Sequence, residues 1–386
     1  MANSNLTKAK NAKNDEFYTQ WTDIERETQA YLEYNPDVFR GKTILCPCDD
    51  PEWSNFTKFF ALHFHEYGLR KLISTSYAVE SKNYKESYQI TLFEQNSSNF
   101  DVDKTRTHGK IFVLESEDMN RDGIVNIDDL KWNYLQGDGD FRSEEVKKLR
   151  SEADIIVTNP PFSLFREFLA WIVENDKQFL IIGNMNAITY KEIFPLIMGN
   201  KMWLGNGFRA GNAYFSSPVT RSYANGVFNP DSGLVKFRNC CWFTNLDHGR
   251  RHQPIPLMTM ADNLKFSRHK GIKNKATYDR YDNYDAIEVP FTDSIPADYN
   301  GIMGVPVSFL EKYCPEQFEI EGMCENIDLY TLKTKVYSAT ECRQAYFNKF
   351  GKKGIYDLNA SGVLFKDGLL EKVYQRILIK KKKVEE

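Results

Sequence analysis

Four consecutive residues, Asn159, Pro160, Pro161 and Phe162, have the types and the order needed to hold an amino group carried by an aromatic ring. They follow the apolar run 155–157, which is typical of a buried strand. Pro160 forces Asn159 into an extended conformation, and Pro161 has no N–H that could compete for the Pro160 carbonyl oxygen. The Asn159 side-chain oxygen and this carbonyl oxygen can therefore accept both hydrogens of an exocyclic amine and direct its lone pair at an electrophile, while Phe162 stacks on the ring. A proline-rich turn that only ends a strand is the alternative interpretation.

The elements that must position this segment alternate between strands and helices. Short apolar runs predict strands at 42–46, 69–77, 153–159, 178–185 and 202–205, and helical periodicity predicts helices at 23–34, 54–68, 163–176 and 189–200. This alternation indicates an α/β fold with a parallel, doubly wound sheet, whose ligands gather at the carboxyl ends of the strands.

The alternation stops at about residue 208. From there to about residue 278 the chain is rich in Gly, Asn, Ser, aromatic and basic residues, and we interpret it as an appended target-recognition region. The predicted organisation is a flexible segment at 1–14, a catalytic core at 15–207, and a target-recognition and C-terminal region at 208–386.

Composition narrows the setting in which this chemistry takes place. With 386 residues, of which 41% are hydrophobic, the chain can bury a sizeable core. Its net charge of -3 excludes binding of nucleic acid by bulk charge and requires local basic patches instead. Seven cysteines without a paired pattern favour a reducing cytoplasm. The chain has no apolar signal segment and no run of roughly 18 apolar residues, so we expect no membrane contact.

The segment 118–130 has the spacing of a calcium-binding loop. Oxygen ligands and a glycine occupy loop positions 1, 3, 5, 6, 9 and 12, which are Asp118, Asn120, Asp122, Gly123, Asn126 and Asp129. We therefore predict a structural Ca²⁺ in an insertion at 116–131, with a metal-free acidic turn as the alternative. The predicted metal ligands are Asp118, Asn120, Asp122 and Asp129.

The segment around Asn159 also resembles the catalytic motif of amino-group DNA methyltransferases, and the wider chain resembles the EcoRI-type adenine-specific DNA methyltransferases. The blocks that carry this resemblance include "DEFYTQ", "CDDPEWSNFTKFFA", "GDGDFRS", "DIIVTNPPFSLFREFL", "FLIIGNMNAITYKE" and "DYNGIMGVPVSFL". The resemblance implies a Rossmann-like methyltransferase sheet that transfers a methyl group from S-adenosylmethionine to adenine N6 in duplex DNA, with the base rotated out of the stack. It also implies a modification role, either alone or beside a restriction endonuclease that acts on the same DNA site.

The resemblance also implies positions for the cofactor. The block at 15–19 implicates Phe17, Tyr18 and Thr19 at the methionine end of the donor. The block that follows the first predicted strand implicates Cys48, Asp49 and Asp50, although the glycine-rich turn usual at this point is missing. The block at 137–142 implicates Asp140 and Phe141 at the adenine of the cofactor.

Basic residues beyond the catalytic core are the candidates for DNA contact. Arg209 and Arg221 lie in a polar, aromatic segment suited to base edges and phosphates. The run 265–275 holds five cations and no acid, which suits phosphate contact; these are Lys265, Arg268, Lys270, Lys273 and Lys275. A solvated charged face is the alternative.

Other functions remain open at this point. Cytosine N4 could be held by the same two acceptors, and a related class of enzymes methylates protein glutamine through a similar turn. A calcium-dependent interaction protein built on the Asp118 loop is a non-enzymatic alternative, but it would normally have paired loops. A cytosine C5 enzyme would need a cysteine nucleophile after a proline, and "CPC" at 46–48 follows a different predicted strand from the Asn159 segment.

Overall fold

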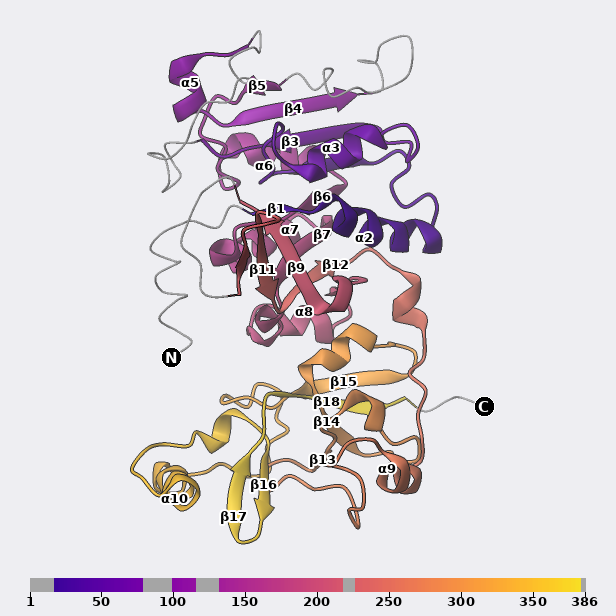
Figure 1. Cartoon of the computed structure of the whole chain (residues 1–386), viewed down its shortest axis with the longest axis vertical. Coiled ribbons are helices and arrows are strands. Elements are labelled where there is room, and N and C mark those ends of the chain that lie inside the picture. The colour runs from indigo at the N-terminus through magenta and orange to yellow at the C-terminus, as the bar shows by residue number, and fades with distance from the viewer. Residues whose placement is uncertain (1–16, 79–98, 116–131, 218–225, 383–386) are drawn as a thin grey trace. The chain divides into compact units, whose positions relative to one another are not determined.

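The computed structural model describes residues 17–78, 99–115, 132–217 and 226–382, and it divides the chain into two compact units (Figure 1). The first unit consists of Met1–Ile197 and Lys201–Gly249, and the second of Met198–Asn200 and Arg250–Glu386. The boundary expected after residue 207 therefore lies inside the first unit. The predicted flexible segment 1–14 lies outside the described residues.

The first unit is built on an eight-stranded sheet with the order β5-β4-β3-β2-β6-β7-β12-β8. The strands are β2 (Thr43–Cys46), β3 (Lys71–Thr75), β4 (Lys110–Glu115), β5 (Trp132–Tyr134), β6 (Ile155–Thr158), β7 (Gln178–Asn184), β8 (Trp203–Leu204) and β12 (Cys240–Thr244). The central strands β3, β2, β6 and β7 run parallel, as the alternation predicts.

The sheet is mixed rather than wholly parallel, which corrects the expectation from sequence. β4 runs antiparallel to β3 and β5, and β12 runs antiparallel to β7 and β8. β12 pairs its first residue, Cys240, with Asn184 at the carboxyl end of β7. Because the chain enters β12 at that edge, the strand must run back along β7.

Helices cover both faces of this sheet. The helices of this unit are α2 (Trp21–Tyr34), α3 (Asn55–Leu62), α5 (Val102–Thr107), α6 (Glu144–Glu152), α7 (Phe165–Val173) and the short α8 (Phe194–Met198). Ile155 and Val157 share a core cluster with Phe56 of α3. On the opposite face, Phe165 of α7 packs against Phe243 of β12, with ring centroids 5.2 Å apart. Successive residues of a strand point to opposite faces, so β6 is buried on both sides.

A second, antiparallel sheet joins the start of the described chain to the segment after β8. Its order is β1-β9-β11-β10, with β1 (Tyr18–Thr19), β9 (Asn212–Ser216), β10 (Phe228–Asn229) and β11 (Leu234–Arg238). Tyr18 pairs with Ser216, and Val235 pairs with Phe215. Much of the segment expected to be an appended region is therefore part of the first unit.

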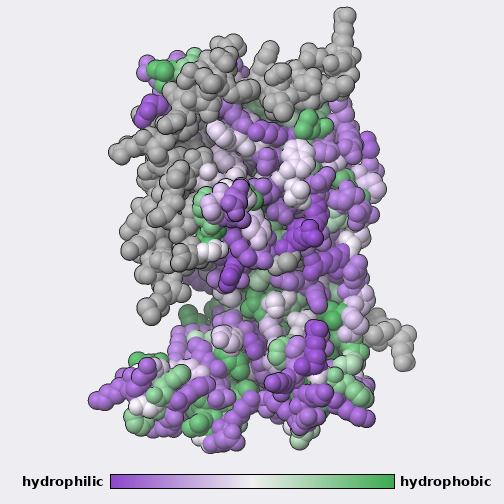
Figure 2. Space-filling view, in the orientation of Figure 1, coloured by the Kyte–Doolittle hydropathy of each residue, from purple (hydrophilic) through white to green (hydrophobic). Residues whose placement is uncertain are grey.

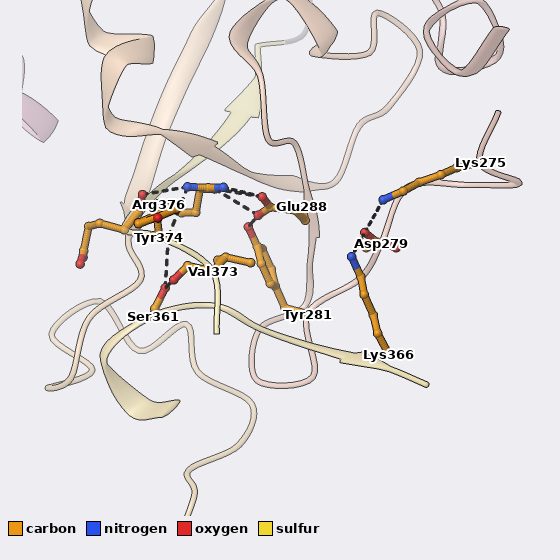
Figure 3. Close-up of polar contacts among 10 residues, drawn as sticks. Lys275, Asp279, Tyr281, Glu288, Ser361, Lys366, Val373, Tyr374 and Arg376 are labelled. Carbon is orange, nitrogen blue, oxygen red and sulfur yellow. Dashed lines mark hydrogen bonds and ion pairs between the residues drawn. The ribbon is translucent and has the colours of Figure 1, made fainter. Parts of the chain in front are cut away.

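The second unit contains a four-stranded sheet with the order β13-β14-β18-β15 and a β16-β17 hairpin. The elements are α9 (Met260–Phe266), β13 (Ala286–Glu288), β14 (Ile302–Pro306), β15 (Phe318–Met323), α10 (Ala339–Phe350), β16 (Val363–Lys366), β17 (Leu369–Lys372) and β18 (Arg376–Lys381). In its interior the Arg376 guanidinium contacts both carboxylate oxygens of Glu288, and the Tyr281 hydroxyl also donates to Glu288 (Figure 3). The buried charge is thus paired and hydrogen-bonded, as burial requires.

The surface is largely hydrophilic on the face shown in Figure 2, with apolar patches between the hydrophilic residues. Among the described residues, no helix is long and apolar enough to cross a membrane.

Candidate active site

The predicted acceptor pair lies where the parallel strands end. β2, β3 and β6 deliver the segments that follow them to one edge of the sheet, because parallel strands have their carboxyl ends on the same side. The Asp49 N–H donates to the Thr75 carbonyl oxygen at 2.9 Å, and the Ser74 hydroxyl donates to the Asp49 carbonyl oxygen at 2.5 Å. These two bonds fix the turn after β2 to the end of β3.

The Asn159 side chain is held in one orientation. Its Nδ2 donates a hydrogen bond of 2.7 Å to the carbonyl oxygen of Phe17. Its Oδ1 is buried and accepts no hydrogen bond from the residues that the structure describes. A buried amide oxygen without a donor costs free energy unless a ligand supplies one. The site therefore presents an acceptor that a substrate N–H can satisfy.

Asp49 is tied to the strand that carries Asn159. Its Oδ2 accepts from the Thr158 hydroxyl at 2.5 Å, and its Oδ1 accepts from the Ser54 hydroxyl at 2.6 Å. All three side chains are buried. Thr158 directly precedes Asn159, so the Asp49 carboxylate connects the β2 turn and the start of α3 to the acceptor segment.

Phe162 belongs to an aromatic cluster that comes from distant parts of the chain. Its ring is half-buried and meets Phe215 and Phe237 edge to face, with centroids 6.4 Å and 5.8 Å apart. Phe17 lies edge to face with Phe237 at 4.7 Å. Phe215 and Phe237 lie on β9 and β11, and no local pattern in the sequence indicates that they lie beside Phe162. Phe215 and Phe237 therefore pack against Phe162 from the second sheet of this unit.

The block at 17–19 is buried, and its last two residues, Tyr18 and Thr19, form β1. Tyr18 and Thr19 pair with β9, and the Thr19 carbonyl oxygen accepts from the Asn55 side chain at 2.7 Å. The Thr19 hydroxyl is buried and has no hydrogen-bond partner in the described parts of the chain. It is a second polar group at this edge that a ligand can satisfy.

Asp50 differs from Asp49 in its surroundings. Its Oδ1 accepts from the Glu52 N–H at 2.9 Å, and its Oδ2 lies 3.9 Å from the Lys110 ammonium. Lys110 pairs more closely with Glu52, at 2.8 Å, and Glu52 also accepts from the Trp132 indole at 2.9 Å. The sequence did not single out Glu52 or Lys110. Cys48 is half-buried beside these groups in the chain.

The block at 137–142 approaches the same edge. Gly139 has φ of 80°, and a Cβ there would lie 2.1 Å from the Ser76 carbonyl oxygen, so only glycine fits. Phe141 is buried and packs edge to face against Phe168 and Trp171. The Asp140 carboxylate pairs with the Arg142 guanidinium at 2.6 Å, and this hydrogen bond raises the pKa of Arg142.

A buried carboxylate holds the turn that leads to Arg209. Glu27 of α2 accepts from the Tyr31 hydroxyl at 2.8 Å, from the Asn206 N–H at 2.8 Å and from the Gly207 N–H at 2.9 Å. Burial is the largest cause that raises the pKa of Glu27, to about 7, against the opposing effect of these donors. Arg209 itself is exposed.

The other predicted DNA contacts fall into three groups. Arg221 lies outside the described residues. In the second unit, Arg268 pairs with Asp293 at 2.9 Å and Lys275 pairs with Asp279 at 2.7 Å, and Asp279 also binds Lys366 (Figure 3). Lys265, Lys270 and Lys273 are exposed, and none of the three has an acidic partner among the described residues.

The predicted calcium ligands Asp118, Asn120, Asp122 and Asp129 lie outside the described residues. Within the described part of the chain, no group of three or more His, Cys, Asp or Glu side chains could hold a metal ion. All seven cysteines lie in the described ranges as thiols rather than disulfides.

Comparison with known proteins decides the family. The family model for the adenine-specific methyltransferase EcoRI matches residues 5–382. The chain belongs to the EcoRI family of adenine-specific methyltransferases. It is 42% identical to the Type II methyltransferase M.EcoRI of Escherichia coli over 329 residues, which cover 84% of this chain and 91% of that protein. It is 35% identical to the Type II methyltransferase M.MpnI of Mycoplasma pneumoniae over 86% of this chain and 90% of that protein. No solved structure matches the chain.

Membership of the EcoRI family establishes the reaction class. The chain is an adenine-specific DNA methyltransferase, and the family implies S-adenosylmethionine as methyl donor and DNA as substrate. The mixed α/β architecture agrees with this assignment.

Proposed function

We propose that Asn159, Pro160, Pro161 and Phe162 form the catalytic segment that methylates adenine N6 in duplex DNA. The observation that carries the proposal is the buried Asn159 Oδ1, which accepts no hydrogen bond from the described residues although its Nδ2 is held by Phe17. An adenine amine placed here donates one N–H hydrogen bond to this oxygen and a second to the Pro160 carbonyl oxygen. Both acceptors favour the cationic, tetrahedral nitrogen that develops during transfer.

The base must leave the duplex to reach these acceptors. In a base pair the adenine amine is turned toward its partner, so the nucleotide rotates out of the stack before the reaction. Phe162 stacks on the extruded base, and the edge-to-face contacts of its ring with Phe215 and Phe237 keep it in place. The expected fold for this chemistry is a Rossmann-like methyltransferase sheet, and the parallel order β3-β2-β6-β7 supports it.

The methyl donor fits the same edge of the sheet. S-adenosylmethionine supplies an electrophilic methyl group on a sulfonium centre. The Thr19 hydroxyl lacks a partner in the described chain, and the Asp50 carboxylate can face the cationic methionine end. Asp49 is the weaker candidate for direct contact, because Thr158 and Ser54 already occupy its carboxylate. Phe17 and Tyr18 directly precede Thr19 and stay candidates for the methionine end of the donor. Cys48, in the turn after β2, stays a candidate for cofactor contact.

Asp140 and Phe141 stay candidates for the adenine end of the cofactor. The close approach of Gly139 to Ser76 supports their place near the end of β3. The ring of Phe141 is buried and in contact with Phe168 and Trp171, and the Arg142 guanidinium lies over it, 5.4 Å from the centroid.

We also propose a biological role for the methylation. The relatives are named Type II methyltransferases, which supports a role in protecting a DNA site from a cognate restriction endonuclease. The structural Ca²⁺ at 118–129 stays a prediction from the sequence alone.

Transfer of a labelled methyl group tests the proposed function. The enzyme is incubated with tritiated S-adenosylmethionine and unmethylated plasmid DNA, and the DNA is digested to nucleosides. We expect the label to appear in N6-methyldeoxyadenosine. Label in N4-methyldeoxycytidine would show that the acceptor is the cytosine amine and would overturn the proposal for adenine. Label in protein alone would overturn the proposal of DNA methylation.

A further inference from the structure

Helix α10 of the second unit is capped at both ends and buries only a narrow stripe of side chains. Ser338 and Glu341 form a capping box at its start, and Gly351 ends it in the left-handed conformation, with φ of 65°. Only Cys342 and Ala345 of the helix are buried. They belong to a small core cluster with Leu358 and Val363. In Figure 1 the helix lies beside the β16-β17 hairpin at the margin of the second unit.

The opposite face of α10 is exposed and carries side chains suited to reading base pairs. With 3.6 residues per turn, Arg343, Gln344, Phe347 and Asn348 lie on the side turned away from Cys342 and Ala345. All four are exposed. Gln344 donates to Asn348 at 2.7 Å. Phe347 is 51% exposed, and its ring makes no aromatic contact within the described residues. We call these four residues the α10 face.

The charge of α10 and of the two residues after its terminal glycine is mostly positive. Residues 339–353 hold four cations and one acid, Glu341. Glu341 is engaged with Ser338, and Lys349 pairs with Glu371 of β17 at 3.1 Å. The three remaining cations, Arg343, Lys352 and Lys353, are exposed and have no acidic partner in the part of the chain that the structure describes. Figure 2 shows hydrophilic surface mixed with apolar patches at this margin of the second unit.

We propose that the α10 face enters the major groove of duplex DNA, an inference that rests on DNA being the substrate. An α-helix fits that groove, and Gln or Asn amides can pair with adenine edges, while Phe can contact a thymine methyl group. The three unpaired cations then neutralise phosphates on either side of the groove. A protein partner would leave these cations without counterions unless it were acidic, whereas DNA satisfies both the charge and the amides.

The phosphate part of the proposal is tested by salt dependence. Binding to a short fluorescent duplex that carries a site found by methylation mapping is measured over a range of salt concentrations. For the Arg343→Ala, Lys352→Ala, Lys353→Ala variant, we expect the slope of log K against log salt to fall by about 0.9 for each phosphate that the protein no longer neutralises. The control is Lys312→Ala, Lys380→Ala, which removes two exposed lysines outside α10 and should leave the slope unchanged.

The base-reading part is tested by specificity. DNA from cells that express Gln344→Ala, Asn348→Ala is mapped for methylated adenines. We expect discrimination at one or more positions of the site to fall by about 5- to 150-fold, while transfer at the best site continues. We expect thermal unfolding of each variant to match that of the wild type, because the replaced side chains are exposed.

The outcomes separate this inference from the proposed function. Wild-type methyl transfer to DNA tests the function by itself. The α10 proposal is overturned if the triple variant binds with the wild-type slope and the double variant methylates the wild-type sites with unchanged selectivity. A change in sedimentation of the variants with unchanged DNA binding would instead assign the face to a second copy of the chain and would also overturn the proposal.

Discussion

The side-chain nitrogen of Asn159 donates to the main-chain carbonyl oxygen of Phe17, 142 positions earlier in the chain, at 2.7 Å. This bond decides which end of the amide is presented to a substrate. With the nitrogen engaged, the oxygen is the free end, and an oxygen can only accept. This orientation supports the proposal that Asn159 accepts a hydrogen bond from a group with N–H donors, such as the adenine amine.

The first prediction concerns the chemical step. Asn159→Ala removes an acceptor that strengthens in the transition state, so the single-turnover rate should fall by about a hundredfold or more, with much smaller changes in donor and DNA affinity. Rapid-quench kinetics at saturating donor and DNA measure the rate. Asn245→Ala is the matched control, since Asn245 binds Phe179 and Lys177 at the other end of β7. A wild-type rate in Asn159→Ala would remove this segment from the active site.

The second prediction concerns capture of the extruded base. Phe162→Leu keeps apolar bulk but loses the aromatic face, and stacking is worth roughly 1 to 3 kcal/mol per base. The fluorescence of 2-aminopurine at the target position should therefore report less extruded base in Phe162→Leu. Phe162→Tyr, which keeps the ring, should behave like the wild type. Equal fluorescence in both variants would show that Phe162 serves only the aromatic cluster.

The third prediction assigns Asp49 a positioning role. Thr158→Val deletes the hydroxyl that donates to Asp49 and keeps the shape of the side chain. We expect about 1 to 3 kcal/mol less stability and a lower kcat with little change in donor Kd, because the strand that carries Asn159 is less firmly held. Thr28→Val removes a buried hydroxyl of α2 and should lower stability alone. If the donor Kd rises in Thr158→Val while kcat is kept, the Asp49 carboxylate serves the cofactor instead.

The fourth prediction separates the lysines of the basic run. Replacing Lys270 and Lys273 by Ala should lower the salt slope of DNA binding by about 0.9 for each phosphate contact. Lys275→Ala should have a smaller effect, since Lys275 is paired with Asp279 at 2.7 Å. Titration with a fluorescent duplex measures both. Identical slopes for the wild type and the double variant would place Lys270 and Lys273 on a solvated face.

The fifth prediction concerns pH and Glu27. Burial raises the pKa of Glu27 in the folded protein to about 7, above its ordinary value of 4.5, so the folded state binds the proton more tightly than the unfolded state. The resulting stabilisation is complete below pH 4.5 and is lost as the pH rises through about 7. Relative to Glu27→Gln, the free energy of unfolding of the wild type should therefore decrease over this range, by at most about 3 kcal/mol. Urea denaturation at several pH values measures it, and a constant difference would contradict the raised pKa.

The sequence by itself determined the local features of the site. Two prolines after an apolar run place Asn159 at the end of β6, because proline restricts its own backbone and that of the residue before it. The periods of the apolar residues predicted β2, β3, β6 and β7 and the helices between them, since these periods report which faces are buried. The resemblance of the chain to a known family is confirmed by the match over residues 5–382, whereas the catalytic role of the Asn159 block stays a prediction.

Tertiary structure decided which distant residues meet. Phe17, Phe215 and Phe237 gather around Phe162 only because β1, β9 and β11 pair in one antiparallel sheet. The parallel pairing of β2 and β6 likewise brings Asp49 within hydrogen-bond distance of Thr158. The fold of the second unit brings Lys366 into an ion pair with Asp279. Periodicity and turn residues describe a chain over a few positions at a time. Strand pairing and long-range contacts such as Phe17–Phe237 contribute free energy only after segments far apart in the sequence have come together.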